Sequence, residues 1–283
     1  MKFDVVLGNP PYQAPKIRTI GKPLGSCGSR LWHKFVELSF DICKDDGYIS
    51  LIHPSLWRKP ENKLYPLFKE NNLIYLDIND INTGRKTFGV STRYDWYVVQ
   101  KSNYSGKTKI NDEDGNKIEM DISGYPFIPN CNFDLINSLL AKKDEKKCQV
   151  LYSRSMYGAD KKNMRSEQDD VFKHPCVYMI TKSSGLSLWY ADADKGHFGV
   201  PKVIISENGG FLGTCVDADG SYGLTQFMFA LVIENKQEGE NIQKVIIFEE
   251  FKKVWKAIQW MSNHREWRIF KYFKKDFWKE FDL

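Results

Sequence analysis

The stretch FDVVLGNPPY, Phe3–Tyr12, decides the fold class of this chain. Phe3–Leu7 is an apolar-rich run stopped by Gly8 and two prolines, which is typical of a central parallel strand buried on both faces. The prolines remove two backbone donors and fix φ, so the loop presents its carbonyl groups rigidly. A loop at the C-terminal end of a parallel strand lies where open α/β sheets bind ligands.

The same loop has the chemistry to hold a planar amine. Asn9 offers a side-chain carbonyl, Pro10 offers a backbone carbonyl, and Tyr12 offers a flat apolar ring. Two acceptors can hold the two N–H groups of the amine while the ring stacks on its heterocycle, and the nitrogen lone pair is then free to attack an electrophile. The plainer interpretation of NPPY is a proline-rich turn that ends a strand.

Strands and helices alternate after the loop. The pattern predicts helices over Arg30–Asp45, with Ser29 as N-cap, and over Glu61–Asn71. It predicts strands over Tyr48–Pro54, Leu73–Asn79 and Tyr94–Lys101, followed by a hairpin at DEDGNK. This order is typical of an α/β fold with a parallel, doubly wound sheet.

The character of the sequence changes past Cys131. A connecting helix is expected over Phe133–Lys142, and strands and turns then dominate from Val150 to Ile233. We expect a partial catalytic domain at residues 1–145 and a strand-rich α+β domain at residues 146–283.

Composition is that of an ordinary globular protein, with 42% hydrophobic and 27% charged residues. The longest strongly apolar segment, Phe227–Ile233, is too short to span a bilayer, and the N-terminus does not have the pattern of a secretory signal. We therefore expect a soluble, cytoplasmic protein. The six cysteines form no C-x-x-C pair and the five histidines show no metal-ligand spacing, so neither zinc nor a disulfide framework is predicted.

Positive charge is concentrated at the C-terminal end. The formal net charge is only +5, but the segment from Lys252 onward contains nine Lys or Arg against four Asp or Glu, interleaved with aromatic residues. One interpretation is a C-terminal helix that packs its aromatic rings into a core and leaves its lysines in water. The alternative is a face that binds nucleic acid.

Three segments together resemble a known family. They are FDVVLGNPPYQ, SRLWHKFVELSFDICKDDGYISLIHPSLW and TFGVSTRYDWYVVQK. In order and spacing they resemble the gamma-type adenine-N6 DNA methyltransferases of bacterial and phage restriction-modification systems, which implies a bacterial or phage origin. The resemblance covers about the first hundred residues of the chain. It implies transfer of a methyl group from S-adenosylmethionine to the N6 of an adenine flipped out of double-stranded DNA.

The family's catalytic roles carry over by position. The resemblance implies that Asn9 and Pro10 hold the amine, that Pro11 completes the catalytic loop, and that Tyr12 stacks on one face of the base. Phe88 is the candidate for the other face, although a hydrophobic anchor of the loop before the next strand is an equal alternative.

The sequence departs from the family at the cofactor site. The family holds S-adenosylmethionine mainly on an earlier glycine-rich loop, and only eight residues precede Asn9. The glycines at Gly21–Gly28 and Gly209–Gly210 lack the strand and helix context of such a loop. We therefore expect a C-terminal half whose main cofactor-binding residues are unknown, with an N-terminal methyltransferase half or subunit as its partner. Without that half it is expected to be inactive.

In the family arrangement the second domain reads the DNA sequence. Candidate contacts to phosphates and base edges are Arg154, Lys161, Lys162, Asn163 and Arg165. A solvated surface loop is the plainer interpretation for any one of them.

Two other functions stay open. The chain could be a non-catalytic DNA-binding or specificity subunit in which NPPY is a remnant. It could also be a protein glutamine-N5 methyltransferase, which shares NPPY because it methylates a planar amide nitrogen; the long chain after the predicted sheet counts against this.

Overall fold

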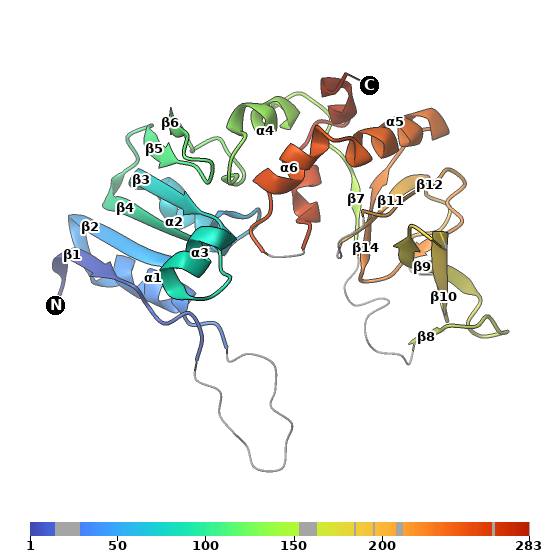
Figure 1. Cartoon of the computed structure of the whole chain (residues 1–283), viewed down its shortest axis with the longest axis horizontal. Helices are drawn as coiled ribbons and strands as arrows, with labels where there is room; N and C mark the ends of the chain where they lie inside the picture. Colours follow the sequence, from blue (N-terminus) through green and yellow to red (C-terminus); the bar gives the residue numbers. More distant parts are fainter. Residues whose placement is uncertain are drawn as a thin grey trace, which may run out of the picture. The chain divides into compact units, whose positions relative to one another are not determined.

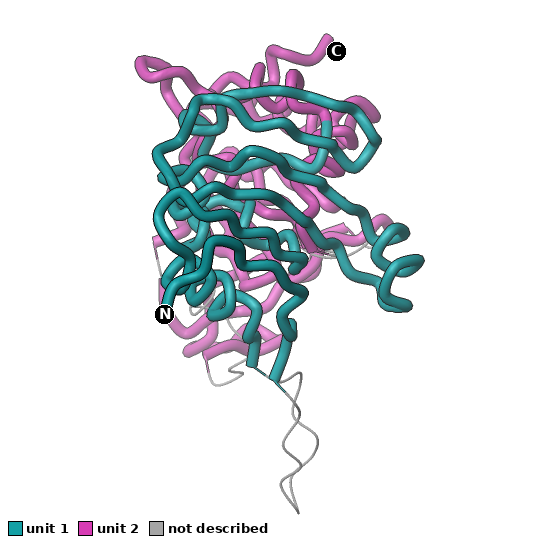
Figure 2. Tube along the Cα trace, turned by 90° about the vertical axis from the view of Figure 1, so that its left-hand side faces the viewer, with its two compact units in different colours: residues 1–131 teal, residues 132–283 magenta. Residues whose placement is uncertain are grey.

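A computed structural model describes residues 1–14, 29–152, 163–183, 185–194, 196–207, 212–261 and 264–282. The chain divides into two compact units, Met1–Cys131 and Asn132–Leu283, which are coloured separately in Figure 2. Each unit is described by itself.

The first unit contains a six-stranded sheet. Its strands are β1 (Phe3–Gly8), β2 (Cys43–Pro54), β3 (Asn71–Asn79), β4 (Tyr94–Asn103), β5 (Thr108–Asn111) and β6 (Lys117–Met120). Its helices are α1 (Trp32–Ile42), the 3-10 turn η1 (Ser55–Arg58), α2 (Tyr65–Glu70) and α3 (Ile81–Phe88) (Figure 1).

The strand order is β1-β2-β4-β3-β5-β6. β1 runs parallel to β2, and β3 runs parallel to β5. β4 is antiparallel to both of its neighbours, β2 and β3. The expected α/β class is confirmed, but the sheet is mixed and not wholly parallel, because β3 leads into β4 through the short helix α3 and the chain reverses direction there.

One face of this sheet carries the core of the unit. Successive side chains of a strand point to opposite faces, and the buried set includes Ile49 and Leu51 of β2 and Tyr97 of β4. Phe68 of α2 packs edge-on against Tyr97, with ring centroids 4.9 Å apart, and stacks on Trp57 of η1 at 3.9 Å. Helix α1 connects β1 to β2, and α2 connects β2 to β3; the strands in each connection are parallel, and both connections move along the sheet in the same direction. Because such crossovers are right-handed, both helices lie on this same face.

β1 corrects one expectation. It stands at the end of the strand order, and among the described residues it pairs only with β2. Val5 is 61% exposed and Leu7 is 79% exposed. The prediction of a central strand buried on both faces is therefore wrong within this chain, although its apolar composition is that of such a strand.

The helix boundaries also differ from the predictions. α1 begins at Trp32 with Leu31 as N-cap and no side-chain cap, so Ser29 is not the N-cap. α3 was not predicted, yet its signals are local: the Asp80 side chain accepts a hydrogen bond from the Thr83 N–H at 2.7 Å, and Gly89 ends the helix with φ +71°. The hairpin at DEDGNK is confirmed, with Gly115 at φ +83° in its turn between β5 and β6.

The second unit is strand-rich, as expected. Its strands are β7 (Val150–Leu151), β8 (Met164–Arg165), β9 (His174–Thr181), β10 (Gly185–Ala191), β11 (Lys202–Ser206), β12 (Thr214–Asp217), β13 (Gly223–Leu224) and β14 (Met228–Val232). They form two four-stranded sheets, ordered β13-β9-β10-β8 and β12-β11-β14-β7. Its helical elements are α4 (Phe133–Leu139), α5 (Lys236–Ile247), α6 (Phe251–Ala257), η3 (Trp267–Lys271) and η4 (Phe277–Glu280).

Helix α4 groups with the second unit, so the division falls at 131/132, whereas the sequence suggested 145/146. The segment after α4 is tied to the C-terminal part by isolated bridges of Leu140 with Phe273 and of Lys147 with Lys274.

The C-terminal segment is a core element. Phe251, Phe270, Phe273 and Phe277 are fully buried, and the rings of Phe270 and Phe277 lie 5.6 Å apart. The segment is one short helix followed by 3-10 turns, not a single long helix. Its lysines largely face acidic neighbours, as in the pairs Lys252–Glu249, Lys253–Glu250, Lys274–Glu280, Lys275–Glu234 and Lys279–Asp276. The core interpretation of this segment is therefore confirmed.

Candidate active site

The loop Asn9–Tyr12 leaves the C-terminal end of β1 and is held by backbone hydrogen bonds. The Leu31 N–H donates to the Tyr12 carbonyl at 3.0 Å, and the Ala14 N–H donates to the Ser29 carbonyl at 2.8 Å. These bonds fasten the loop to the segment just before α1. Pro10 is buried whereas the neighbouring Asn9 is exposed. The backbone of the loop is therefore held in place, while the side-chain amide of Asn9 is accessible to a ligand.

Three other elements end or begin at the same edge of the sheet. Because β2 is parallel to β1, its last residue, Pro54, lies at this edge. The first residue of β4, Tyr94, pairs with Pro54 on one side and with Asn79, the last residue of β3, on the other. The edge is therefore built from the C-terminal ends of three strands and the start of a fourth, as expected for the ligand-binding edge of an open α/β sheet.

Tyr12 is half-buried at this edge. Burial raises the pKa of its phenol to about 12, with smaller contributions from Tyr94 and Asp95. Its hydroxyl oxygen is buried and has no hydrogen-bond partner among the described residues. The phenol is thus neutral at physiological pH, and its ring provides an aromatic surface and not a charge.

Tyr94 connects the two aromatic candidates. After burial, it is the largest of the causes that raise the pKa of the Tyr12 phenol. It also meets Phe88 edge-to-face, with ring centroids 4.9 Å apart and planes at 76°, and its hydroxyl is 3.2 Å from Thr87 Oγ1. Phe88 is the last residue of α3 and remains partly exposed. The structure therefore places Phe88 in ring contact with a buried tyrosine that also acts electrostatically on Tyr12. Tyr94 was not among the residues predicted from the sequence. It directly follows the TFGVSTR segment, which contains Phe88, and this position could have indicated it.

A buried, neutral histidine contacts residues at this edge of the sheet. His53 is fully buried, stacks on Trp32 at 4.8 Å, and has its pKa lowered to about 4 by burial. Its Nδ1 lies 3.1 Å from the Pro54 carbonyl and its Nε2 lies 2.9 Å from the Tyr97 hydroxyl. A carbonyl can only accept, so Nδ1 carries the proton and the Tyr97 hydroxyl donates to Nε2.

A buried ion pair fixes the turn that follows β2. The Asp95 carboxylate accepts hydrogen bonds from Arg58 Nε at 2.7 Å, Arg58 Nη2 at 3.0 Å and Trp57 Nε1 at 2.8 Å. Arg58 also donates to the carbonyl groups of Ile128 and Pro129 and to Asn130 Oδ1, at 2.9 to 3.1 Å. Arg58 and Asp95 are both fully buried, so the pair rigidly joins η1, β4 and the last residues of the first unit.

The predicted DNA contacts are only partly described. Arg154, Lys161 and Lys162 lie outside the described residues. Asn163 is half-buried, and its carbonyl accepts from the Asp192 N–H at 3.4 Å. Arg165 is exposed on β8, where its guanidinium lies 4.4 Å from the centre of the Phe172 ring.

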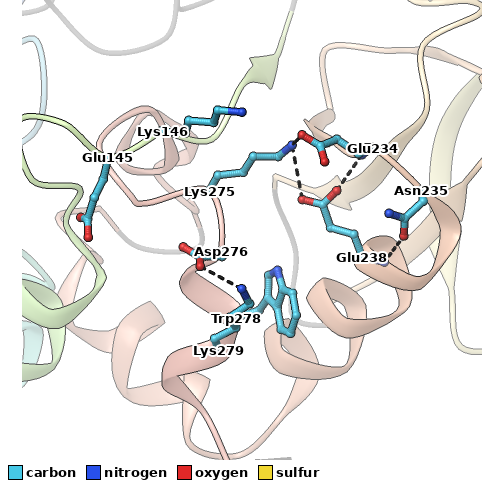
Figure 3. A pocket seen from close by; sticks show the side chains of 9 residues that line it. All are labelled: Glu145, Lys146, Glu234, Asn235, Glu238, Lys275, Asp276, Trp278 and Lys279. Atoms are coloured by element: carbon cyan, nitrogen blue, oxygen red, sulfur yellow. Dashed lines mark hydrogen bonds and ion pairs between the residues drawn. The ribbon is translucent and has the colours of Figure 1, made fainter.

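A pocket of about 460 Å³ lies within the second unit, and Figure 3 shows its charged lining. Lys275 points between Glu234 and Glu238, while Asp276 pairs with Lys279 at 3.1 Å. Lys275 therefore joins the start of α5 to the C-terminal segment, and the Asp276–Lys279 pair lies within that segment. In the part of the chain that the structure describes, no cluster of His, Cys, Asp and Glu could hold a metal ion, and no helix is long and apolar enough to cross a membrane.

Known proteins are similar to part of this chain. Residues 1–88 match the family of Eco57I restriction-modification methylases. An uncharacterized adenine-specific methylase of Mycoplasma pneumoniae is 28% identical over 134 residues, which cover 44% of this chain and 30% of that protein. The matched part thus spans about a third of the relative's length.

Solved structures give weaker likenesses. The Type IIL restriction-modification enzyme MmeI in complex with DNA has a TM-score of 0.48 at 9% identity, covering 95% of this chain and 45% of that one. A modification subunit of a putative type I restriction enzyme from Vibrio vulnificus has a TM-score of 0.29 at 13% identity, covering 41% and 27%. Both are too remote to assign a function.

The sheet edge and the family match agree on a class of protein: over residues 1–88 the chain is similar to the Eco57I restriction-modification methylases. That match takes in the first two of the three motif segments, and the resemblance to restriction-modification methyltransferases is confirmed.

Proposed function

We propose that this chain is the catalytic and DNA-recognition part of an S-adenosylmethionine-dependent adenine-N6 DNA methyltransferase. The observation that carries the proposal is the tethered Asn9–Tyr12 loop at the ligand-binding edge of the sheet, within the segment that matches the methylase family. The adenine-specific relative supports the choice of base.

The chain's own residues hold and orient the amine. The Asn9 side-chain carbonyl and the Pro10 backbone carbonyl accept the two N–H groups of adenine N6, which turns the nitrogen lone pair away from the ring. Tyr12 stacks on one face of the flipped base, and Phe88, held by Tyr94, closes the other. Stacking and hydrogen bonds in the pocket offset the few kcal/mol that flipping costs.

The described residues do not fit S-adenosylmethionine by themselves. Beside the catalytic loop they offer an exposed Asn9 and the open side of β1, with no glycine-rich turn between a strand and a helix next to them. S-adenosylmethionine would supply the methyl group when bound, and we assign its binding to an N-terminal methyltransferase half or subunit.

The test is single-turnover methyl transfer to unmethylated phage DNA by this chain together with that part, scored as N6-methyladenine. Asn9→Ala should lower the rate by about a hundredfold or more, because it removes a preorganised acceptor at the reacting nitrogen. Asn82→Ala is the matched control, since Asn82 is an exposed asparagine on α3 that bonds only to Asp80 among the described residues.

Each result decides between functions. Full activity of Asn9→Ala would show that the amine is held elsewhere. DNA binding without any methyl transfer would favour a non-catalytic specificity subunit, and methylation of a release-factor glutamine in place of DNA would favour the protein methyltransferase.

A further inference from the structure

Arg58 is a fully buried arginine at the end of the turn that follows β2, and all five of its N–H groups have acceptors. Nε and Nη2 donate to the two carboxylate oxygens of Asp95, at 2.7 and 3.0 Å. The other bonds, at 2.9 to 3.1 Å, go to the carbonyl groups of Ile128 and Pro129 and to Asn130 Oδ1. One side chain therefore joins the turn after β2, the start of β4 and the end of the first unit.

A buried ion pair such as Arg58 with Asp95 contributes little to stability by its charge alone. Both ions lose their water on burial, and replacing such a pair by apolar residues of similar volume is often neutral or stabilising. An arginine does fix the direction of its partners, because its planar fork of donors is rigid. The pair is therefore explained better by the geometry that it imposes than by stability.

On the side of β4, this geometry reaches the aromatic residues of the candidate active site. Asp95 directly follows Tyr94, the first residue of the strand. The Tyr94 ring contacts the Phe88 ring at 4.9 Å, and Tyr94 and Asp95 both act electrostatically on Tyr12. A displacement of Asp95 would therefore move Tyr94 and, with it, the support of Phe88.

On the other side, Arg58 holds the segment by which the chain leaves the first unit. Residues 128–130 precede the division between the units at 131/132. The segment is also bonded to the backbone of the turn, since the Ile128 N–H donates to the Arg58 carbonyl at 3.0 Å. The arginine that fixes the start of β4 thus also fixes the course of the chain toward the second unit.

We propose that Arg58 is a positioning residue for methyl transfer, which holds Tyr94 and Phe88 in place through Asp95 and ties them to residues 128–130. The inference rests on the proposed function, in which Phe88 closes one face of the flipped base. Arg58 is fully buried, so it acts through these residues and not by contact with the base. Its effect belongs to the rate of methyl transfer and not to the affinity for DNA.

The experiment is single-turnover methyl transfer to unmethylated phage DNA by an Arg58→Lys chain together with the N-terminal methyltransferase half or subunit. Lysine keeps the charge but offers three donors in place of five and has no planar fork. The rate at saturating DNA should fall by about ten- to a hundredfold, because even a small misplacement of the base slows a reaction that depends on position. The KM for DNA should stay within about twofold of the wild-type value.

Lys202→Arg is the matched control, because it makes the same exchange in the opposite direction at a buried ion pair of the second unit. Lys202 Nζ lies 2.6 Å from the Asp217 carboxylate and donates to the carbonyl groups of His197 and Val200. The control should lose stability in urea unfolding without losing rate at saturating DNA. All rates are measured at a temperature at which the unfolding curves show the variants to be folded.

A second variant covers the case in which Arg58→Lys does not fold. Asp95→Asn keeps the shape of the carboxylate but weakens the same pair, and it should lower the rate at saturating DNA while leaving the KM for DNA unchanged. A folded Asp95→Asn chain with the full rate would overturn the proposal.

A double-mutant cycle tests whether Arg58 acts through Phe88. If it does, Arg58→Lys should slow a Phe88→Ala chain much less than it slows the wild-type chain, because the ring that it positions is absent. Fully additive effects would overturn the proposal, and so would an Arg58→Lys rate equal to that of Lys202→Arg.

The outcomes separate this inference from the proposed function. If the wild-type chain with the N-terminal half or subunit transfers no methyl group to DNA, the proposed function fails and the positioning role falls with it. If the wild-type chain transfers the methyl group and Arg58→Lys does so at the same rate, only the positioning role fails.

Discussion

Tyr12 combines a fixed backbone with a hydroxyl that bonds to nothing described around it. If its ring is a stacking surface, Tyr12→Ala in the reconstituted enzyme should slow methyl transfer by about five- to a hundredfold, from the roughly 1–3 kcal/mol that one base–aromatic contact contributes. Tyr12→Phe should keep the rate, because the ring remains and no hydrogen bond is lost. The measurement is single-turnover methylation, with duplex binding measured in parallel. A Phe variant as slow as the Ala variant would assign the role to the hydroxyl instead.

His53 should make the protein less stable in mild acid. Its pKa is lowered to about 4 in the folded state, from an unfolded value near 6.5. Between these two values the unfolded chain binds a proton that the folded protein does not, so the free energy of unfolding falls as the pH falls from 6.5 to 4. The contribution is roughly 3 kcal/mol in total.

The double variant His53→Phe with Tyr97→Phe tests this, because it removes the titrating ring together with its hydrogen-bond partner. Urea unfolding across this pH range should show a flatter profile for the double variant than for the wild type. His197, whose pKa burial also lowers, remains in both proteins and cancels in the difference. Equal slopes would show that His53 is accessible to protons in the folded state.

At the scale of elements, the sequence predicted what short-range periodicity encodes. The strands around Tyr48–Pro54, Leu73–Asn79 and Tyr94–Lys101 appear in the structure with modest shifts. The antiparallel direction of β4 could not be predicted, because it depends on how the connection through α3 returns the chain to the sheet and not on the residues of β4. The exposure of β1 could not be predicted either, because the apolar run Phe3–Leu7 reads the same whether or not a neighbouring strand is present. At the site, the loop chemistry was readable from NPPY, but the role of Tyr94 depends on pairing between distant strands.

Helix α3 positions Phe88 and depends on one glycine. A Cβ on Gly84 would lie 1.9 Å from the Thr92 carbonyl oxygen, a backbone atom that cannot turn aside. Gly84→Ala should therefore push α3 away from the segment that leads into β4, displace Phe88 from Tyr94 and cost about 1–3 kcal/mol of stability.

Chemical denaturation measures this loss, and Gly124→Ala is the control because a Cβ there meets nothing within 4 Å. In the reconstituted enzyme Gly84→Ala should also slow methyl transfer. A Gly84→Ala protein as stable as the control would mean that α3 does not pack against Thr92.

At the scale of the whole molecule, most lysines of the C-terminal segment have acidic neighbours where the structure describes them. Lys252 and Lys253 on α6 face Glu249 and Glu250, and Lys275 faces Glu234 and Glu238. We therefore expect contacts to DNA phosphates from the candidate residues Arg154, Lys161 and Lys162 and not from the C-terminal segment. Each neutralised phosphate releases counterions, so the logarithm of the affinity should fall linearly with the logarithm of the salt concentration, by about 0.9 per contact.

The double substitution Lys161→Gln with Lys162→Gln removes two positive charges. It should weaken binding to duplex DNA and make that slope shallower by about two, if both lysines contact phosphates. Fluorescence anisotropy with a labelled duplex over a range of salt concentrations measures both quantities. The control is Lys252→Gln with Lys253→Gln, which removes the same charge from paired positions on α6 and should leave the slope unchanged. If the Lys252→Gln with Lys253→Gln variant changes the slope and the Lys161→Gln with Lys162→Gln variant does not, the C-terminal segment is the DNA-binding face. The positive charge of that segment would then have a role beyond balancing its acidic neighbours.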